Sequence, residues 1–531
     1  MAQAATPTLP ASAIGAPAAA ERIDPMRMVA FLAMCFGMFM AFLDIQVVSA
    51  SLTEIQAGLA ASADEINWVQ TSYLMAEVVA IPLSGFLSRA LGTRIMFAGA
   101  AAGFTVASLM CGLSSTMGQM IFWRALQGFI GGGMVPTVFA SAYIIFPRSR
   151  MSIITPMIGL VATLAPTIGP TVGGILTDAL SWHWLFFINI VPGIVVTIAA
   201  ITLIDFDKPD LALFDNFDWI GLIFMALFLG ALEYVLEDGP RYDWFEDSSI
   251  FLSAIVSGTS ALIFFARVLL AREPIVDLRA FSDRNFALGS MFSFVLGIGL
   301  YGLTYLYPVY LGTIRGHNAL MVGETVFVSG VTMFLTAPLV GRLVTRMDPR
   351  LMLSFGFAVV ALSNWQLTYL TKDWDFWQLF IPQLLRGFGM MFAIVPITNI
   401  SLGTLPPDRL KNASGLFNLT RNLGGAVGLA GLNTVLNNRI DLHLARLHES
   451  ITWSRRPVME MLSGLAARIP TSDAQNMALK QLFLFTRQQG IVMAFADVFL
   501  LLCGLFAVFS AMVWFMRRPP PVAGAATIDA H

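Results

Sequence analysis

Charged residues are scarce in this chain. Only 12% of its 531 residues are Asp, Glu, Lys or Arg, while 57% are hydrophobic and the mean hydropathy is +0.74. A soluble domain carries about 25% charged residues because its surface faces water. This composition therefore excludes a soluble globular protein and predicts an exterior that is largely in contact with lipid. No basic patch accompanies the net charge of −2, so we expect no nucleic-acid partner.

Reactive side chains are also few. Cys35, Cys111 and Cys503 each lie in an apolar run without the spacing of metal ligands, so we expect no metal. None of the five histidines lies deep in such a run, which argues against a histidine proton relay. The chain has no Walker sequence and no Gly-x-Ser-x-Gly nucleophile elbow. We therefore expect no cofactor, no catalysis and no ATP-driven pumping within this chain.

Long apolar runs, in contrast, are abundant. A helix needs about 20 predominantly apolar residues to cross the hydrocarbon core of a bilayer. Fourteen such runs predict an all-α integral membrane protein with spans near residues 28–50, 67–88, 95–114, 118–146, 151–176, 182–204, 217–236, 250–270, 284–312, 322–346, 350–371, 376–403, 410–437 and 491–516.

The distribution of Lys and Arg predicts the orientation of these spans, because short positive loops stay in the cytoplasm. With a cytoplasmic N-terminus, the short inner loops and the tails hold eighteen Lys and Arg. The short outer loops, counted without the long segment 438–490, hold only Arg241, Arg315 and Lys372. We expect a multi-pass protein of the bacterial inner membrane with both termini in the cytoplasm. The acidic loop from Asp205 to Asp218 fits this orientation poorly.

The spans fall into groups of six, two and six. A polar, amphipathic segment over residues 438–490 separates the last two spans, and it is expected to form helix or loop in the periplasm. We predict the following division: a cytoplasmic tail over 1–26, an N-terminal six-helix bundle over 27–204, an inserted two-helix segment with its loops over 205–283, a C-terminal six-helix bundle over 284–516 and a cytoplasmic tail over 517–531.

Two motifs recur at a nearly constant offset. The segment from Gly85 to Arg94 is matched by the segment from Gly341 to Arg350, 256 residues later. Gln127-Gly128-Phe129 is matched by Arg386-Gly387-Phe388, 259 residues later. This spacing predicts two homologous bundles that begin on the same side of the membrane. Alternating-access carriers have such parallel repeats, with the substrate site between the halves near the midplane.

Four segments resemble the major facilitator superfamily, and within it the fourteen-span drug:proton antiporters of the EmrB/QacA type. Leu43-Asp44 resembles the acidic motif of the first span, and Arg124-Ala-Leu-Gln-Gly resembles the arginine motif of the fourth. Gly85, Arg89, Gly92 and Arg94 belong to a loop motif whose second copy contains Gly341, Arg346 and Arg350. The fourth segment comprises the fifth-span antiporter motif and Trp182 to Asn189. The resemblance covers residues 28–516 and implies proton-driven export.

The loop motif departs from the family pattern at one place. The family usually has an aspartate where Arg89 stands and an arginine where Ala90 stands. The change removes a charge partner, so the interaction that this loop makes during gating is left open by the sequence.

Ionisable residues at bilayer depth are costly unless they are paired or face water, which makes each one a functional candidate. The resemblance assigns Asp44 and Arg124 to proton coupling. Glu77 joins them because burial near mid-membrane disfavours its charged form, as a proton carrier requires. Fixed interhelical pairing is the alternative for all of these residues. Secondary candidates for transport are Glu233, Arg386, Arg421 and Asp497. Glu233, in the inserted segment, fits a functional and a structural role equally well, whereas structural or gating roles are favoured for Arg421 and Asp497.

Small residues and prolines mark the fifth span. They remove side chains from one helix face and take away backbone donors, which permits close packing and a bend. Ordinary close packing would need the same residues, and the family resemblance favours a gating role. The set is Gly159, Pro166, Gly169, Pro170, Gly173 and Gly174.

These features predict a transporter, not an enzyme: a proton-coupled antiporter that exports hydrophobic or amphipathic drugs, with the proton gradient as its energy source. One alternative is a dedicated exporter of a single metabolite, lipid or siderophore, and another is a membrane enzyme or receptor. The family resemblance further implies two partners, a periplasmic adaptor and an outer-membrane channel, with residues 438–490 as the docking region.

Overall fold

The computed structural model describes residues 24–517 except 63, 148–149, 216, 272–273, 318, 407–408 and 469–472. Of the two predicted tails, only residues 24–26 and Arg517 fall within this range. The regular structure of the described residues is entirely helical, which confirms the predicted fold class. The N-terminal bundle is formed by α1 (Pro25–Ala50), α3 (Trp68–Ala90), α4 (Gly92–Gly112), α5 (Met117–Gly131), α6 (Met134–Ile145), α7 (Met151–Ala179), α8 (Trp184–Phe187) and α9 (Ile190–Leu203); α2 (Leu52–Leu59) is a short helix outside it.

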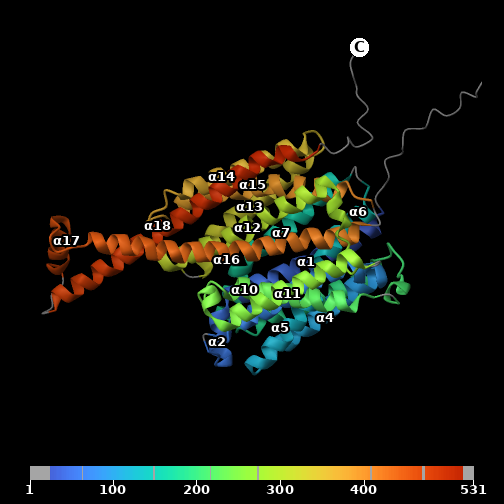
Figure 1. Ribbon diagram of the computed structural model, residues 1–531, viewed down its shortest axis with the longest axis horizontal. Helices are drawn as coiled ribbons and strands as arrows, with labels where there is room; N and C mark the ends of the chain where they lie inside the picture. The colour runs from blue at the N-terminus through green and yellow to red at the C-terminus, as the bar shows by residue number, and fades with distance from the viewer. Residues whose placement is uncertain are drawn as a thin grey trace, which may run out of the picture.

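The C-terminal bundle and the inserted pair complete the architecture. The bundle is formed by α12 (Arg284–Tyr310), α13 (Ala319–Leu343), α14 (Pro349–Leu367), α15 (Phe376–Gly403), α16 (Leu410–Ser450) and α18 (Ala474–Met512). The inserted pair is α10 (Trp219–Asp238) and α11 (Ser248–Leu270). We call the end of the molecule where α1 begins and α18 ends the termini side, and the opposite end the hairpin side; they lie right and left in Figure 1.

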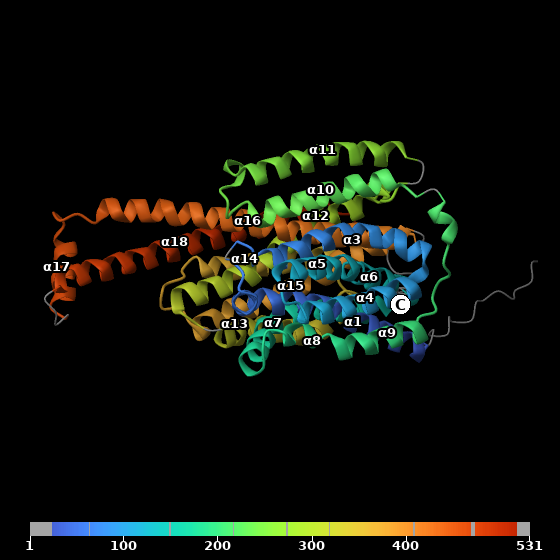
Figure 2. The ribbon, with the colours of Figure 1, turned by 90° about the horizontal axis from the view of Figure 1, so that it is seen from below.

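Twelve helices of the described chain are long and apolar enough to cross a membrane. Helices α14 and α16 are not among them, although they lie parallel to the others in the bundle (Figures 1 and 2). Asn412, Asn418, Arg421 and Asn422 make the first half of α16 polar. These twelve helices and the placement of α14 and α16 are consistent with fourteen spans, and that count remains a prediction.

The outer surface is apolar where the bundle has no further helix to cover it. On α11, Leu262, Leu269 and Leu270 are 74%, 79% and 82% exposed. Exposed leucines along a long apolar helix are expected where the neighbour is lipid instead of water. Large aromatic side chains such as Phe97, Phe104, Phe292 and Phe357 are buried inside the bundles.

Equivalent glycines make equivalent contacts in the two bundles. A side chain at Gly128 would overlap the backbone of Tyr73 in α3, and one at Gly387 would overlap the backbone of Ser329 in α13. Each contact joins the fourth helix of its bundle to the second. The offset found in the sequence therefore corresponds to the same close helix packing in both halves.

The two bundles also meet each other through glycines on the termini side. Gly85, at the end of α3, packs against the backbone of Lys411 and Asn412 at the start of α16. Gly341, at the end of α13, packs against the carbonyl of Ser152 at the start of α7. These are the first glycines of the two motif copies, so the repeat places the same close approach on both sides of the interface.

Hydrogen bonds between the bundles gather in the same region. The Tyr143 hydroxyl donates to the Thr398 carbonyl at 3.0 Å, and the Thr155 hydroxyl donates to Asn399 Oδ1 at 2.8 Å. The Ser414 hydroxyl donates to the Pro136 carbonyl at 2.7 Å. The structure thus has its two bundles joined toward the termini side.

The inserted pair covers one edge of the interface between the bundles. Helix α10 packs on α3 of the N-terminal bundle and on α16 of the C-terminal bundle, and α11 packs on its outer face. Figure 2 shows α10 and α11 as a separate layer over α3, α12 and α16. The pair therefore contacts both halves of the repeat.

A helical hairpin projects beyond the bundles on the hairpin side. Helices α16 and α18 continue past the other helices, and α17 (Arg456–Ala466) lies across their tip (Figures 1 and 2). Leu462, Ala478 and Leu482 form a small core of their own there. The described residues of the polar segment 438–490 are thus mainly helical, the first of the two forms expected for it.

The repeated glycine contact can be tested by adding a side chain. Gly387→Val and Gly128→Val should each destabilise the protein by about 1–3 kcal/mol, because the new methyl groups would overlap a backbone carbonyl in a packed interior. The measurement is the thermal unfolding midpoint of purified protein in detergent. Gly99→Val is the matched control, since nothing lies within 4 Å of a Cβ at that position. Equal midpoints for all three variants would contradict the packing described.

Candidate site: a buried charge network in the N-terminal bundle

Asp44 and Arg124 form an ion pair that is enclosed by the N-terminal bundle. Arg124 Nη1 lies 2.6 Å from Asp44 Oδ2, and both side chains are 0% exposed. Asp44 is on α1 and Arg124 is on α5, so the pair joins two spans. Breaking a buried pair by removing one partner costs about 3–5 kcal/mol, because the other charge is left uncompensated.

Neighbouring groups satisfy most of the remaining hydrogen-bonding capacity of the pair. Gln127 Nε2 donates to Asp44 Oδ1 at 3.1 Å, and Asn189 Nδ2 donates to the same oxygen at 2.8 Å. Arg124 Nε donates to the Val69 carbonyl at 3.1 Å, and its guanidinium lies 4.2 Å from the centroid of the Tyr73 ring. The side chains of Gln127 and Asn189 therefore complete the hydrogen bonding of the Asp44 carboxylate, and the Val69 carbonyl and the Tyr73 ring complete the surroundings of Arg124.

Gln127 and Asn189 were not among the predicted site residues. Both lie in motifs that the sequence made visible, Gln127 in the fourth-span arginine motif and Asn189 at the end of the segment that follows the fifth span. Asn189 also donates to Ser108 Oγ at 3.1 Å, which ties the site to α4. Polar residues next to an ionisable pair in an apolar run are the signal that could have identified them.

Glu77 is buried but stands apart from the ion pair. It is 4% exposed, and in the described chain it has neither a hydrogen-bond nor an ion-pair partner. Its side chain lies over Gly132, where α5 gives way to α6, and it is near enough to Arg124 and Asp44 to interact with their charges. Arg124 Nη2 is buried without a partner and is thus a donor not engaged in this conformation.

Arg386 and Arg421, the two site arginines predicted in the C-terminal half, are buried without a carboxylate partner in the described chain. Arg386 Nη2 donates to Thr304 Oγ1 at 2.8 Å, and its guanidinium lies 5.5 Å from the Tyr307 ring centroid. Arg421 lies 5.0 Å from the ring centroid of Phe139, which belongs to the other bundle. The structure therefore does not bring these two arginines to Asp44 or Glu77 as partners.

Asp497 belongs to the base of the hairpin instead. Its Oδ2 lies 2.9 Å from His443 Nε2 and 3.6 Å from Arg439 Nε, and its side chain is 32% exposed. These contacts join α16 to α18 where the two helices leave the bundle. The sequence did not reveal His443 as a partner, because the two residues are 54 positions apart.

Glu233 is the most isolated of the predicted charges. It lies on α10, is 6% exposed and has no ion-pair or hydrogen-bond partner in the described chain. It faces the edge of the bundle interface, near Glu77 and Glu237.

The glycines of the fifth span let α7 pack closely on two sides, against α1 and against the C-terminal bundle. A side chain at Gly169 would overlap Gln46, and one at Gly173 would meet the carbonyl of Val47, both on α1. Gly159 faces Ile394 of the other bundle, and the Gly174 carbonyl accepts from Thr177 Oγ1 at 3.1 Å.

Pro166 and Pro170 lie within α7, which is one continuous helix. Opposite α7, Gly323 and Gly330 of α13 admit Thr171 and Thr167. Small residues therefore line both sides of this interface between the bundles.

Asp207 supplies a charge that the loop motif lacks. Its carboxylate accepts from the Thr93 backbone N–H at 3.0 Å, at the start of α4, and pairs with Lys411 at the start of α16. Lys411 Nζ also donates to the Ser88 carbonyl at 2.8 Å. The acidic loop that fits the charge bias poorly thus places its aspartate between the start of α4 and the start of α16.

Other residues of the loop motifs anchor the same turns. Gly92 has a φ of +76°, which favours glycine, and it packs against Pro209. Arg94 Nε donates to the Ile204 carbonyl at 2.5 Å. In the second copy, Arg350 pairs with Asp348 at 2.9 Å, whereas Arg346 has no ion-pair partner in the described chain.

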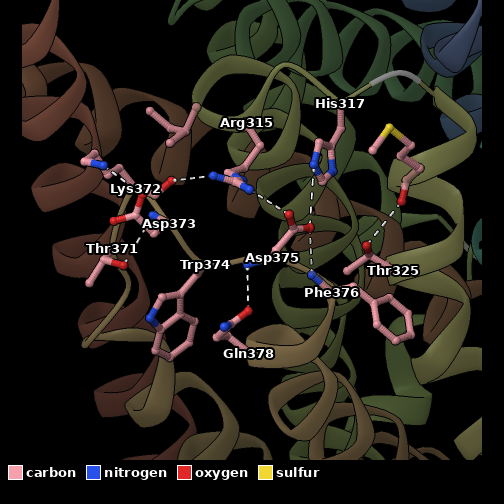
Figure 3. Close-up of polar contacts among 12 residues, drawn as sticks. Arg315, His317, Thr325, Thr371, Lys372, Asp373, Trp374, Asp375, Phe376 and Gln378 are labelled. Atoms are coloured by element: carbon pink, nitrogen blue, oxygen red, sulfur yellow. Dashed lines mark hydrogen bonds and ion pairs between the residues drawn. The ribbon is translucent and has the colours of Figure 1, made fainter.

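A polar cluster ties the connections of the C-terminal bundle on the hairpin side (Figure 3). Arg315 ends a π-helix (Leu311–Arg315) after α12, and its Nη2 lies 2.7 Å from Asp375 Oδ2 at the start of α15. The hydrogen bond from Arg315 lowers the pKa of Asp375, with further lowering by the Phe376 N–H and by His317. Gln488 of α18 donates to the Ile314 carbonyl at 3.1 Å, so this cluster also contacts the hairpin.

No group of His, Cys, Asp and Glu in the described residues could hold a metal ion. The titratable groups of the buried network are the carboxyl groups of Asp44 and Glu77, and Arg124 supplies its positive charge.

Comparisons with known proteins agree with this architecture. The sequence profile of the Major Facilitator Superfamily matches residues 34–429. The chain is 39% identical over 492 residues to the colistin resistance protein EmrB of Acinetobacter baumannii, covering 92% of this chain and 96% of that protein. It is 29% identical to the multidrug export protein EmrB of Escherichia coli, covering 94% and 97%.

Two further similarities are informative. The fatty acid resistance protein FarB of Neisseria gonorrhoeae is 30% identical over 491 residues, covering 92% of this chain and 96% of that protein. The crystal structure of the human organic anion transporter MFSD10 has a TM-score of 0.58 at 12% identity, covering 91% of this chain and all of that one. The structural similarity supports the fold alone.

The contact made by Asp207 can be tested by removing its charge. Asp207→Asn keeps a side chain that can cap α4 but loses the ion pair with Lys411. A partly buried pair of this kind contributes about 1 kcal/mol, so the bundles should separate about fivefold more often on the termini side. The measurement is the rate at which a thiol reagent modifies a cysteine placed at Ser414. Asp205→Asn, in an exposed pair with Arg94, is the control and should leave that rate unchanged; an unchanged rate in Asp207→Asn would contradict the assignment.

Proposed function

We propose that this chain, which belongs to the Major Facilitator Superfamily, exports hydrophobic or amphipathic compounds in exchange for protons. The buried network of Asp44, Arg124 and Glu77 is the observation that carries the proposal. Relatives of this chain are named for multidrug export and for resistance to colistin or fatty acids, which supports export of toxic compounds.

The proton in this mechanism is carried by carboxylates. In the conformation described, Arg124 neutralises Asp44 and leaves Glu77 without a partner. An unpaired carboxylate in an apolar interior favours its protonated form. We infer that a change of conformation brings the free Nη2 of Arg124 toward Glu77, which favours loss of the Glu77 proton and gain of one at Asp44. The two carboxylates then alternate as the site where a proton is held.

The conformational change would take place at the interface between the two bundles. On the termini side the two bundles are joined by close glycine contacts and by Asp207. We propose that this side faces the cytoplasm and that the hairpin lies in the periplasm. Opening would separate Gly85 from α16 and Gly341 from α7, while the glycine-lined contact of α7 with α1 and α13 lets α7 shift without losing packing. The repeat bundles 27–204 and 284–516 would rotate about this interface.

The partners proposed for this transporter are a periplasmic adaptor and an outer-membrane channel. Among the described residues, the hairpin of α16, α17 and α18 projects beyond the bundles (Figure 2), which supports it as the surface that an adaptor would bind. The exported compound would then leave the cell without entering the periplasm.

A single lipid-like substrate is the second candidate. The relative named for fatty acid resistance motivates it, at 30% identity over most of both chains. Competition among a wide panel of compounds distinguishes the two: broad mutual inhibition supports a drug exporter, and inhibition by one chemical class supports a dedicated one.

The export function is tested by expression in a host that lacks its own drug pumps, together with any adaptor gene beside this one. Accumulation of a panel of lipophilic dyes, including ethidium, should fall in cells that express the protein, and it should recover when the proton gradient is collapsed. Unchanged accumulation over the whole panel, with no proton flux, would refute export.

The proton-coupling role is tested by replacing the carboxylates. Glu77→Gln should abolish proton-driven transport and leave folding intact, because the amide cannot take up a proton and the native side chain has no partner to lose. Asp44→Asn should also abolish transport, since it removes a proton site and leaves the Arg124 charge unbalanced. Transport is measured as dye efflux driven by an imposed pH gradient in inverted vesicles.

The matched control for this test is Glu324→Gln, which changes an exposed glutamate on α13. It should transport at the wild-type rate. Wild-type transport by correctly inserted Glu77→Gln protein would eliminate Glu77 from the mechanism.

A further inference from the structure

The mechanism above does not use the carboxylates of the inserted helix α10. Glu233 and Glu237 lie four residues apart, so their side chains project from the same face, about 6 Å apart along the axis. Glu233 is 6% exposed and has no hydrogen-bond or ion-pair partner in the described chain. A membrane helix that only covers an interface does not need buried carboxylates, which are costly at this depth.

These carboxylates lie along a line that leads inward from the hairpin side. At the surface, Arg241 pairs with Asp64 at 2.6 Å, just beyond the end of α10 and before the start of α3. Glu237 is the next to last residue of α10, and Glu233 is one turn deeper.

Glu77 lies deeper still. Gly230, almost one turn further in than Glu233, packs against Met75 of α3, two residues before Glu77. Glu233 is near enough to both Glu237 and Glu77 to interact with their charges. The three glutamates therefore form a series from the hairpin surface to the middle of the bundle.

Other groups also face this series. Helix α12 contributes Tyr301, near Glu77 and Glu233, and Tyr305, near Glu237; Tyr301 donates to Asn422 Oδ1 of α16 at 3.2 Å. Helix α16 also contributes Arg421, near Tyr301.

Helix α11 adds no charge to the series. Its one charged residue, Arg267, pairs with Asp218 at the other end of the helix pair. Phenols and carboxylates thus surround the line, and the nearby cations are Arg124, which faces Glu77, and Arg421, which faces Tyr301.

An independent feature connects Glu77 to the ion pair. The Tyr73 side chain is fully buried, and its hydroxyl has no hydrogen-bond partner in the described chain. Tyr73 and Glu77 are four residues apart on α3 and so lie on the same helix face. Both side chains approach the end of α5: a Cβ on Gly131 would lie 3.6 Å from the Tyr73 hydroxyl, and one on Gly132 would lie 3.1 Å from Glu77 Cγ. The Tyr73 ring also stacks on Arg124. A buried hydroxyl without a protein partner calls for a water or an exchanging proton.

We propose that Glu237 and Glu233 form a proton entry path from the hairpin side to Glu77, with Tyr73 as the final link to the Asp44–Arg124 pair. From Glu237 to Glu233 and from Glu233 to Glu77, a carboxylic acid releases its proton to water, and that water passes a proton to the next carboxylate. In the last step the Tyr73 hydroxyl receives a proton from Glu77 as it passes its own to Asp44, so the phenol ends unchanged. No electrons are exchanged, and the net result is one proton moved inward. This path rests on the proposed function, and it gives the inserted helix pair a role in energy supply.

The experiment separates proton access from substrate handling. Purified protein is reconstituted in liposomes, with ethidium as the probe. Two rates are measured: ethidium–ethidium exchange without a pH gradient, which needs no net proton movement, and ethidium transport driven by an imposed pH gradient. The variants are Glu233→Gln, Glu237→Gln, the conservative Glu233→Asp, and the control Glu324→Gln.

Glu233→Gln and Glu237→Gln should lower the pH-driven rate about tenfold or more, as expected when a proton-transfer group is removed. Exchange should stay at the wild-type rate, Glu233→Asp should recover most of the pH-driven rate, and Glu324→Gln should behave as wild type. The path is refuted if both Gln variants keep the wild-type pH-driven rate, or if both rates fall together, as a purely structural role predicts. If the wild type exchanges ethidium but shows no pH-driven transport, the proposed antiport fails and the path fails with it.

Discussion

The cost of placing charge in lipid is the constraint on which this structure depends. Asp44 and Arg124 are fully enclosed, and each is tolerated because the other lies 2.6 Å away. Gln127, Asn189 and the Val69 carbonyl complete the network, so the pair fixes how α1, α3, α5 and the segment before α9 are arranged. Any change in the charge of Asp44 must therefore be accompanied by a change in this arrangement. Such a link between protonation and helix position is what a coupled carrier requires.

Glycine performs the complementary role at the interface between the bundles. Gly85 and Gly341 allow the halves to touch through backbone atoms, without interlocked side chains that would resist separation. Asp207 adds a charge contact to the same region, between the start of α4 and the start of α16. On the termini side the bundles thus meet through backbone contacts at glycines, one ion pair, and the hydrogen bonds of Tyr143, Thr155 and Ser414.

Much of the architecture was predictable from the sequence because lipid imposes strong rules. The length of apolar runs gave the helices, and motif offsets of 256 and 259 residues gave the repeat. The resemblance pointed to Asp44 and Arg124 as residues of one function, and the structure adds that they form an ion pair. The contacts of Asp207 could not be predicted, because they depend on how the loop after the sixth span folds back. The partners of Asp497 were hidden for the same reason: His443 comes from a distant part of the chain, and the path of the hairpin decides the contact.

The central claim is that a proton and an exported compound bind to one coupled system. It is tested most directly with purified protein in weakly buffered detergent solution, to which ethidium is added while the pH is recorded. The account predicts that binding releases protons, and that the release disappears at a pH low enough to keep the coupling carboxylates protonated. Saturable binding of ethidium without proton release at any pH between 5 and 9 would contradict it.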